Sequence, residues 1–288
     1  MGAAAWTPPD DVLSRPAPAP DLVIRYGTGP EHVADVRLPK SRTGAAVRPA
    51  PLVIFLHGGF WRVAYDRSHT GPMATALAAA GYAVCVPEFR RTGQPGGGWP
   101  GTFDDVAAAV DRSPALVRDA AGPGVIADGP PLLAGHSAGG HLALWAAGRH
   151  RQGPDSAWRS VPEARGVVVL AGVSGLADCS EQGLGDGAAA ALMGGGPADF
   201  PRRYRDADPA ALLPLGRPVR LVHGSLDDVV PASMSSHYAA IGRAAGDDTA
   251  ATEVPGVSHV DVIDPLSPAW PHVMAAFEAL APIASASS

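Results

Sequence analysis

Residues 132–140 read Leu-Leu-Ala-Gly-His-Ser-Ala-Gly-Gly and contain the pattern G-x-S-x-G centred on Ser137. The pattern follows an apolar run and precedes a second apolar run, 142–145, that suits a helix. A strand that turns sharply into a helix holds its serine in a strained backbone conformation with the hydroxyl exposed. The flanking glycines let the strand and the helix approach each other closely. The sequence therefore predicts Ser137 as a nucleophile, with the backbone N–H of Ala138 directed toward a developing oxyanion.

A second motif lies upstream, where residues 57–61 read His-Gly-Gly-Phe-Trp directly after the strand-like run 51–56. Acyl transfer builds negative charge on a carbonyl oxygen, and backbone N–H groups must approach that oxygen closely. Loops of the H-G-G-x type supply such donors beside a nucleophilic serine. We expect the N–H groups of Gly59 and Phe60 to form an oxyanion hole together with that of Ala138.

Chain order indicates where the acid and the base should lie. After a serine in this strand–turn–helix context, the acid comes next along the chain and the histidine last. A strand-like run leads into a loop with the adjacent acids Asp227 and Asp228; we choose Asp227 and keep Asp228 as the alternative. His259 lies between the strand-like run 252–255 and the last helical segment. His259 would accept the serine proton and later protonate the leaving group, while Asp227 would fix its tautomer.

These segments together resemble the α/β-hydrolase fold. Residues 57–61 resemble the H-G-G-[YF]-W loop of kynurenine formamidases (arylformamidases) and related small esterases, and residues 135–142 resemble their nucleophile segment. Residues 223–227 and 259–261 resemble their acid and histidine loops. The resemblance implies an α/β fold with a mostly parallel central sheet flanked by helices. Hormone-sensitive-lipase-like esterases usually carry a third glycine where this chain has Phe60, which points away from that group.

The sequence thus predicts a serine hydrolase that cleaves small acyl esters or aryl formamides through a covalent acyl-enzyme. Kynurenine formamidase activity proper, the hydrolysis of N-formylkynurenine, shares every one of these motifs and stays open as an alternative. A non-catalytic binding module with the same fold is the alternative from another class. Such modules usually lack the serine, the acid or the histidine, and this chain has all three.

Aromatic residues beside the motifs suggest a substrate pocket. Phe60 and Trp61 follow the oxyanion glycines directly, so we expect them to crowd the acyl side and to favour formyl or acetyl groups. Trp99 would border an aryl leaving group. The contrary placement, with Trp61 in the core, would leave the acyl side open.

Length and composition suit a single α/β-hydrolase domain over residues 21–288. The chain has 288 residues, of which 46% are hydrophobic and 17% charged, enough for a full core. Residues 1–20 are rich in Pro and Ala, and we expect them to be poorly ordered or draped on the surface. Residues 172–216 interrupt the alternation of strands and helices. The resemblance implies a small cap-like insertion there; a surface loop without a catalytic part is the alternative.

The net charge and the cysteine content of the chain limit the classes of partner and the cellular compartment that we expect. The net charge of −6, with no basic cluster, argues against nucleic acid. No apolar run reaches the roughly 20 residues of a membrane span, and residues 1–10 lack the features of a secretory signal. Two cysteines form no disulfide framework, so a cytoplasmic protein is expected. The histidine spacing matches no zinc motif, so we expect no metal and no other cofactor. The expected partner is a small-molecule ester or amide substrate, and a homodimer stays open.

Overall fold

The computed structural model describes residues 6–40, 48–161 and 163–283. The strands are β1 Leu22–Arg25, β2 Val33–Arg37, β3 Leu52–Leu56, β4 Ala83–Pro87, β5 Leu132–His136, β6 Val167–Leu170, β7 Val219–Gly224 and β8 Thr249–Val254. The helices are α1 Gly71–Ala80, α2 Gly101–Ala121, α3 Ala138–Gly148, α4 Leu176–Glu181, α5 Leu184–Met193, α6 Pro201–Ala207, α7 Ala232–Ala244 and α8 Trp270–Leu280.

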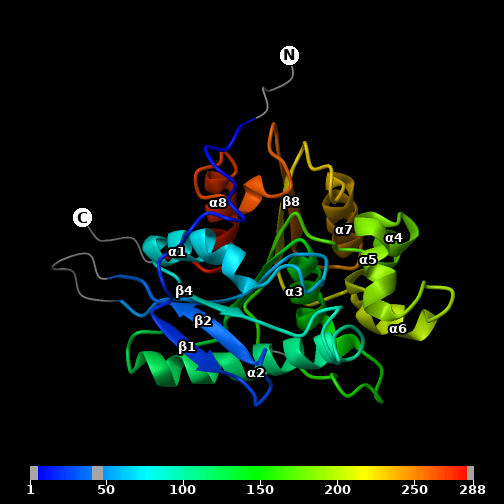
Figure 1. The fold of residues 1–288 in the computed structure, drawn as a ribbon, viewed down its shortest axis with the longest axis horizontal. Helices are drawn as coiled ribbons and strands as arrows, with labels where there is room; N and C mark the ends of the chain where they lie inside the picture. The colour runs from blue at the N-terminus through cyan, green and yellow to red at the C-terminus, as the bar shows by residue number, and fades with distance from the viewer. Residues whose placement is uncertain (1–5, 41–47, 162, 284–288) are drawn as a thin grey trace.

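The strands form one sheet in the order β1-β2-β4-β3-β5-β6-β7-β8 (Figure 1). β1 and β2 pair antiparallel with their neighbours, whereas β3 to β8 are all parallel. Every residue of β3, β4, β5 and β6 is buried. Parallel strands covered on both faces read as continuous apolar runs, which is why these segments were recognisable in the sequence. The predicted α/β-hydrolase fold with a mostly parallel sheet is confirmed.

Helices cover both faces of the sheet (Figure 1). One apolar cluster packs α2, α3 and α7 on one face and includes Phe103, Trp145 and Tyr238. The other packs α1 and α8 on the opposite face and includes Leu77 and Phe277. The two clusters hold the sheet rigid, so the loops at its strand ends start from fixed positions.

Strand register brings the motif-bearing loops together. In the β3–β5 pair, Leu56 lies opposite Gly135, so the H-G-G loop and the serine turn leave the sheet side by side. In the β7–β8 pair, Gly224 lies opposite Val254, and the acid and histidine loops follow. Ligand sites of open α/β sheets lie at the carboxyl ends of the strands, where all four loops begin.

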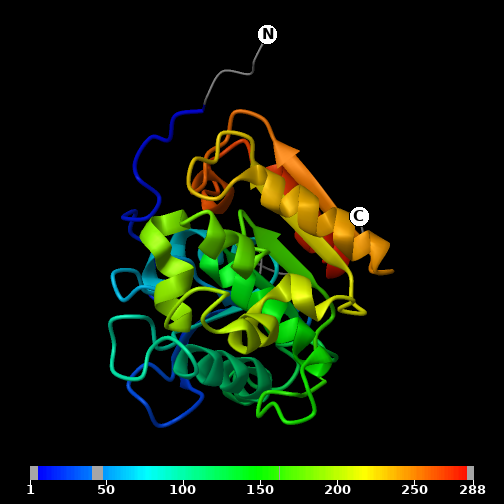
Figure 2. The ribbon, with the colours of Figure 1, turned by 90° about the vertical axis from the view of Figure 1, so that its right-hand side faces the viewer.

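The segment 172–216 lies between β6 and β7 and contains α4, α5 and α6. Figure 2 shows these three helices outside the sheet, on the side turned toward the viewer. The segment reaches the H-G-G loop, since a Cβ at Gly185 would lie 2.7 Å from the Phe60 ring. It is therefore a helical insertion that borders the loop edge.

Residues 6–20, hereafter the strap, contain no helix or strand but are packed against the domain. Val12 is 3% exposed, and Arg15 pairs with the buried carboxylate of Asp264. Residues 1–5 of the predicted segment lie outside the described residues. Across the ranges that the structure describes, none of the helices has both the length and the apolar character that crossing a membrane requires.

Candidate active site

Ser137 stands at the turn between β5 and α3 in a conformation that L-residues rarely adopt. Its φ and ψ are 53° and −122°, and its side chain is buried at the loop edge of the sheet. The turn is tight enough to require glycine on both sides. A Cβ at Gly135 would lie 2.2 Å from the Gly139 carbonyl oxygen, and one at Gly139 would lie 2.0 Å from that of Leu56. Backbone strain of this kind is typical of functional sites.

The H-G-G loop lies directly beside this serine. A Cβ at Gly58 would be 3.1 Å from the Ser137 Cβ. The loop then reverses direction through three consecutive residues with positive φ, namely Gly59 at 108°, Phe60 at 48° and Trp61 at 55°. Within the described ranges, the N–H groups of Gly59, Phe60 and Ala138 donate to no protein acceptor. These three donors, placed around the serine, are free to bind an oxyanion.

Buried contacts of the His57 ring hold the H-G-G loop in its conformation. His57 Nδ1 lies 2.9 Å from the Gly58 carbonyl oxygen, and Nε2 lies 2.9 Å from Glu88 Oε1. The ring stacks on Phe89 at 4.3 Å between centroids. Burial alone would raise the pKa of Glu88, but its contacts with His57 and Arg91 lower it below the ordinary value. His57 therefore shapes the loop, and its ring nitrogens are both occupied.

Asp227 is held by four hydrogen bonds. Its Oδ1 accepts the backbone N–H groups of Val229 at 2.9 Å and Val230 at 2.8 Å. Its Oδ2 accepts Nδ1–H of His259 at 2.7 Å and Nε2–H of His223 at 2.9 Å. Burial alone would raise the pKa of this carboxyl, but the hydrogen bonds from His223 and His259 hold it well below the usual range. The group is a fixed carboxylate that orients the His259 ring.

The structure separates the two adjacent acids and adds a second histidine to the acid site. Asp228, the alternative acid, is exposed, and only Asp227 contacts His259. His223, which sequence reasoning treated only as part of a motif, is the second histidine on Asp227. Its Nδ1 is held at 2.7 Å from Ser235 Oγ. A His-Gly pair at the end of a strand, four residues before an acid, is the signal that could have indicated this role.

His259 projects from the loop between β8 and α8 toward the serine. Its loop is tied to the nucleophile turn, because His136 Nε2 donates to the His259 carbonyl at 3.0 Å. Burial, together with the neighbouring His259, lowers the pKa of His136 well below its ordinary value, so His136 is a neutral donor. Ser137 and His259 are not hydrogen-bonded to each other in this structure. Catalytic contacts of this kind often tighten only when substrate binds.

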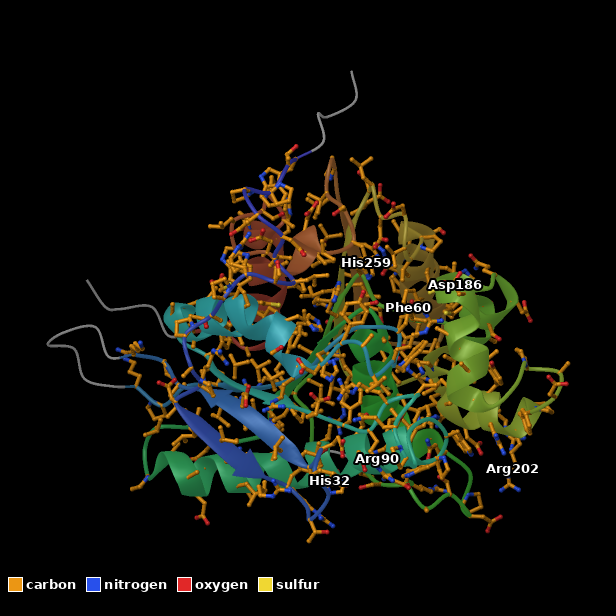
Figure 3. All side chains as sticks on the ribbon, viewed as in Figure 1. His32, Phe60, Arg90, Asp186, Arg202 and His259 are labelled. Carbon is orange, nitrogen blue, oxygen red and sulfur yellow. The ribbon has the colours of Figure 1, made fainter. Side chains whose placement is uncertain are left out.

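Ser137 and His259 face one cavity of about 190 Å³. Figure 3 shows His259 and Phe60 on the same side of the molecule, with Asp186 of the 172–216 segment beside Phe60. The lining combines the serine and histidine with mainly apolar neighbours: Leu13, Gly59, Phe60, Tyr65, His69, His136, Ser137, Val229, His259 and Val260. The volume is below the roughly 300–1,000 Å³ typical of pockets for drug-sized ligands.

The structure places Trp61 and Trp99 away from this cavity, in contrast to the pocket expected from the sequence. Trp61 is 1% exposed and packs edge-on against His141 at 5.2 Å. The indole belongs to the core and does not line the cavity. Trp99 packs against Phe103 and Trp158, at 5.1 and 4.7 Å. Phe60 alone of the expected aromatics lines the cavity.

His69 is a cavity residue that no sequence pattern indicated. It is buried, and burial together with the neighbouring His57 lowers its pKa to about 4. Its ring is therefore neutral near pH 7 and can form hydrogen bonds without adding charge to the cavity. It lies in the short 3-10 helix Arg67–Thr70 before α1, and only the packing of the folded chain brings it to the site.

Comparison with known proteins agrees with this architecture. The "Probable isoprenylcysteine alpha-carbonyl methylesterase ICME" of Oryza sativa subsp. japonica is 27% identical over 263 residues, which cover 84% of this chain and 59% of that protein. "Esterase LipC" of Mycobacterium tuberculosis is 29% identical over 261 residues, which cover 84% and 60%. The chain thus spans about 60% of the length of these curated relatives. A solved "Truncated form of carbohydrate esterase from gut microbiota" superposes with a TM-score of 0.71 at 19% identity, covering 90% of this chain and 95% of that one.

The sheet order, the strained serine turn and this structural likeness define the class: the chain has the α/β-hydrolase fold. Within that class, the BD-FAE family model matches residues 34–240, more than half of the chain. The protein therefore belongs to the BD-FAE family, an α/β-hydrolase esterase family. The match includes Ser137 and Asp227 and ends before His259.

Proposed function

We propose that this protein is a serine esterase for small esters, with Ser137 as nucleophile, His259 as base and Asp227 as the orienting acid. One observation carries the proposal: at the carboxyl ends of the central strands, the strained Ser137 lies beside backbone N–H groups that have no protein acceptor among the described residues. The histidine–carboxylate pair on the same cavity supports it. The curated relatives named as esterases also support it.

The proposed reaction begins when Ser137 Oγ attacks the ester carbonyl and His259 Nε2 takes its proton. The Nδ1–H of the ring keeps its hydrogen bond to Asp227, and that carboxylate stabilises the imidazolium that forms. The carbonyl oxygen becomes an oxyanion and is bound by the N–H groups of Gly59, Phe60 and Ala138. When the C–O bond breaks, the imidazolium gives its proton to the departing alcohol and leaves an acyl-enzyme. Water then attacks by the same route and releases the acid.

The cavity supports a restriction to small substrates. Its volume of about 190 Å³ and its apolar lining suit a short acyl or alcohol group rather than a long chain. The H-G-G-F-W sequence at 57–61 keeps aryl formamides as a second candidate, because a formyl group is smaller still and uses the same chemistry.

Two measurements test the proposal. A fluorophosphonate should label Ser137, as mapped by mass spectrometry, and Ser137→Ala should abolish labelling and lower kcat by roughly 10⁴- to 10⁶-fold. Side-by-side turnover of p-nitrophenyl acetate, p-nitrophenyl octanoate and N-formylkynurenine should show the acetate fastest among the esters. Labelling at another residue, or no turnover of any ester, would reject the esterase assignment. Faster turnover of the formamide than of the acetate would select the second candidate.

A further inference from the structure

The strap, residues 6–20, is fixed to the loop that carries His259. The Trp6 N–H donates to the Gly256 carbonyl at 3.0 Å. Arg15 forms two hydrogen bonds with Asp264, from Nη1 at 2.6 Å and from Nη2 at 2.8 Å. The Asp264 carboxylate is fully buried and the Arg15 side chain is 14% exposed, so this pair is a bidentate anchor that is shielded from solvent.

Two features fix the conformation of the strap. One lies between the two anchors, and the other follows the second anchor. Val12 is 3% exposed and belongs to the apolar cluster that includes Val262 and Ile263. Residues 15–20 read Arg-Pro-Ala-Pro-Ala-Pro, and alternating prolines favour an extended, stiff backbone. The strap is therefore a preorganised wall, and the side chains on its inner surface have defined positions.

Leu13 is the strap residue that lines the catalytic cavity, and Val260 lines the same cavity. The same leucine also lines a second cavity of about 360 Å³. That cavity is bordered by strap residues 14–20 and by polar side chains that include Asp35, Arg37 and Arg67. Leu13 thus stands between a small apolar cavity with the serine and a larger polar cavity without it.

We infer that Leu13 is a specificity-determining residue: its side chain closes the catalytic cavity on the strap side and sets the length of the ester arm that fits there. The inference rests on the proposed function. Shortening the side chain at this position removes the partition and connects the two cavities, so a longer arm gains room. Enlarging it shortens the arm further. The strap thereby selects substrates, while the triad and the oxyanion donors stay unchanged.

The test compares the wild type with Leu13→Ala and Leu13→Phe on two substrate series. One series varies the acyl arm, from p-nitrophenyl acetate to octanoate, and the other varies the alcohol arm, from methyl to octyl acetate. Leu266→Ala is the matched control, because Leu266 is 60% exposed and lines neither cavity. The readout is the ratio of kcat/KM for the long substrate to that for the short one.

Leu13→Ala should raise this ratio by roughly 10-fold in one series, the gain from about two newly buried methylenes. Leu13→Phe should lower it in the same series, and Leu266→Ala should leave it unchanged. The series that responds identifies the arm that faces Leu13. Ratios unchanged in both series for both variants, with wild-type turnover of acetate, would overturn the inference and leave the esterase assignment intact. No ester turnover by the wild type would overturn both. Leu13→Phe keeps the test decisive if Leu13→Ala does not fold.

Discussion

Gly135→Ala is the substitution that most directly tests the geometry of the nucleophile turn. The added methyl would lie 2.2 Å from the carbonyl oxygen of Gly139 and 2.7 Å from the N of Gly140, whereas ordinary contact begins at 3.4 Å. The neighbour is backbone at the start of α3, so no flexible side chain can move aside. Relief requires β5 and α3 to separate by about 1 Å, and overpacking of this kind costs about 1–3 kcal/mol of unfolding free energy.

The same displacement moves Ser137, which sits between these two elements. A shift of about 1 Å in a reacting group costs roughly 100-fold in rate, so kcat/KM for p-nitrophenyl acetate should fall by about that factor. Urea unfolding gives the stability change. Gly153→Ala is the matched control, since Gly153 is exposed and has no atom within 4 Å of an added Cβ. If Gly135→Ala and Gly153→Ala were equally stable and equally active, the tight strand–helix turn argued for Ser137 would be refuted.

Three further predictions follow from the acid site and the buried histidines. Asp227→Asn should lower kcat by roughly 10⁴-fold while Asp228→Asn stays near the wild type in steady-state kinetics; equal losses would place the acid elsewhere. His223→Phe should lower kcat/KM by about 10- to 100-fold, because a hydrogen bond to a charged group contributes about 1.5–3 kcal/mol, and a change in KM alone would contradict this positioning role. Burial lowers the pKa values of His69 and His141 to about 4, so between pH 6.5 and pH 4 the unfolded chain binds protons that the folded protein does not. These two histidines should therefore lower the unfolding free energy from urea titrations by roughly 4 kcal/mol between pH 7 and pH 5, and equal values at the two pH values would contradict it.

The fold and the site could be predicted from the sequence where steric or chemical demands allow only certain residue types at the end of a strand. The turn that carries Ser137 needs glycines at 135 and 139, because a Cβ at either position would lie within 2.2 Å of backbone atoms. Buried parallel strands need continuous apolar runs, so the sheet could be predicted from the same stretches that flank the motifs. The choice between Asp227 and Asp228 rested on loop position alone, and in the structure Asp227 is the one whose carboxylate meets the His259 ring.

Other residues of the cavity wall could not be predicted, because their positions depend on contacts between distant segments. Leu13 lines the cavity because the strap is anchored to a loop about 250 residues later in the chain. A single leucine in a Pro-rich segment forms no sequence pattern that would indicate a role in a cavity. His69 and Tyr65 arrive from the connection between β3 and α1, where sequence periodicity is absent. Their positions follow from tertiary packing, which local sequence preferences do not encode.

The placement of Trp61 shows how such packing serves the site. Positive φ at Phe60 and at Trp61 costs about 1–3 kcal/mol per residue, and only a surrounding structure that over-determines the loop can maintain it. The indole of Trp61 is 1% exposed, and burying a large apolar side chain stabilises by about 1.5–3 kcal/mol. The two residues together cost about 2–6 kcal/mol, so burial of the indole, whose Nε1–H has no hydrogen-bond partner within the described residues, offsets only part of the strain in the turn that carries the N–H groups of Gly59 and Phe60. The two adjacent aromatics therefore lie on different sides of the turn: Phe60 borders the cavity, while Trp61 anchors the turn in the core.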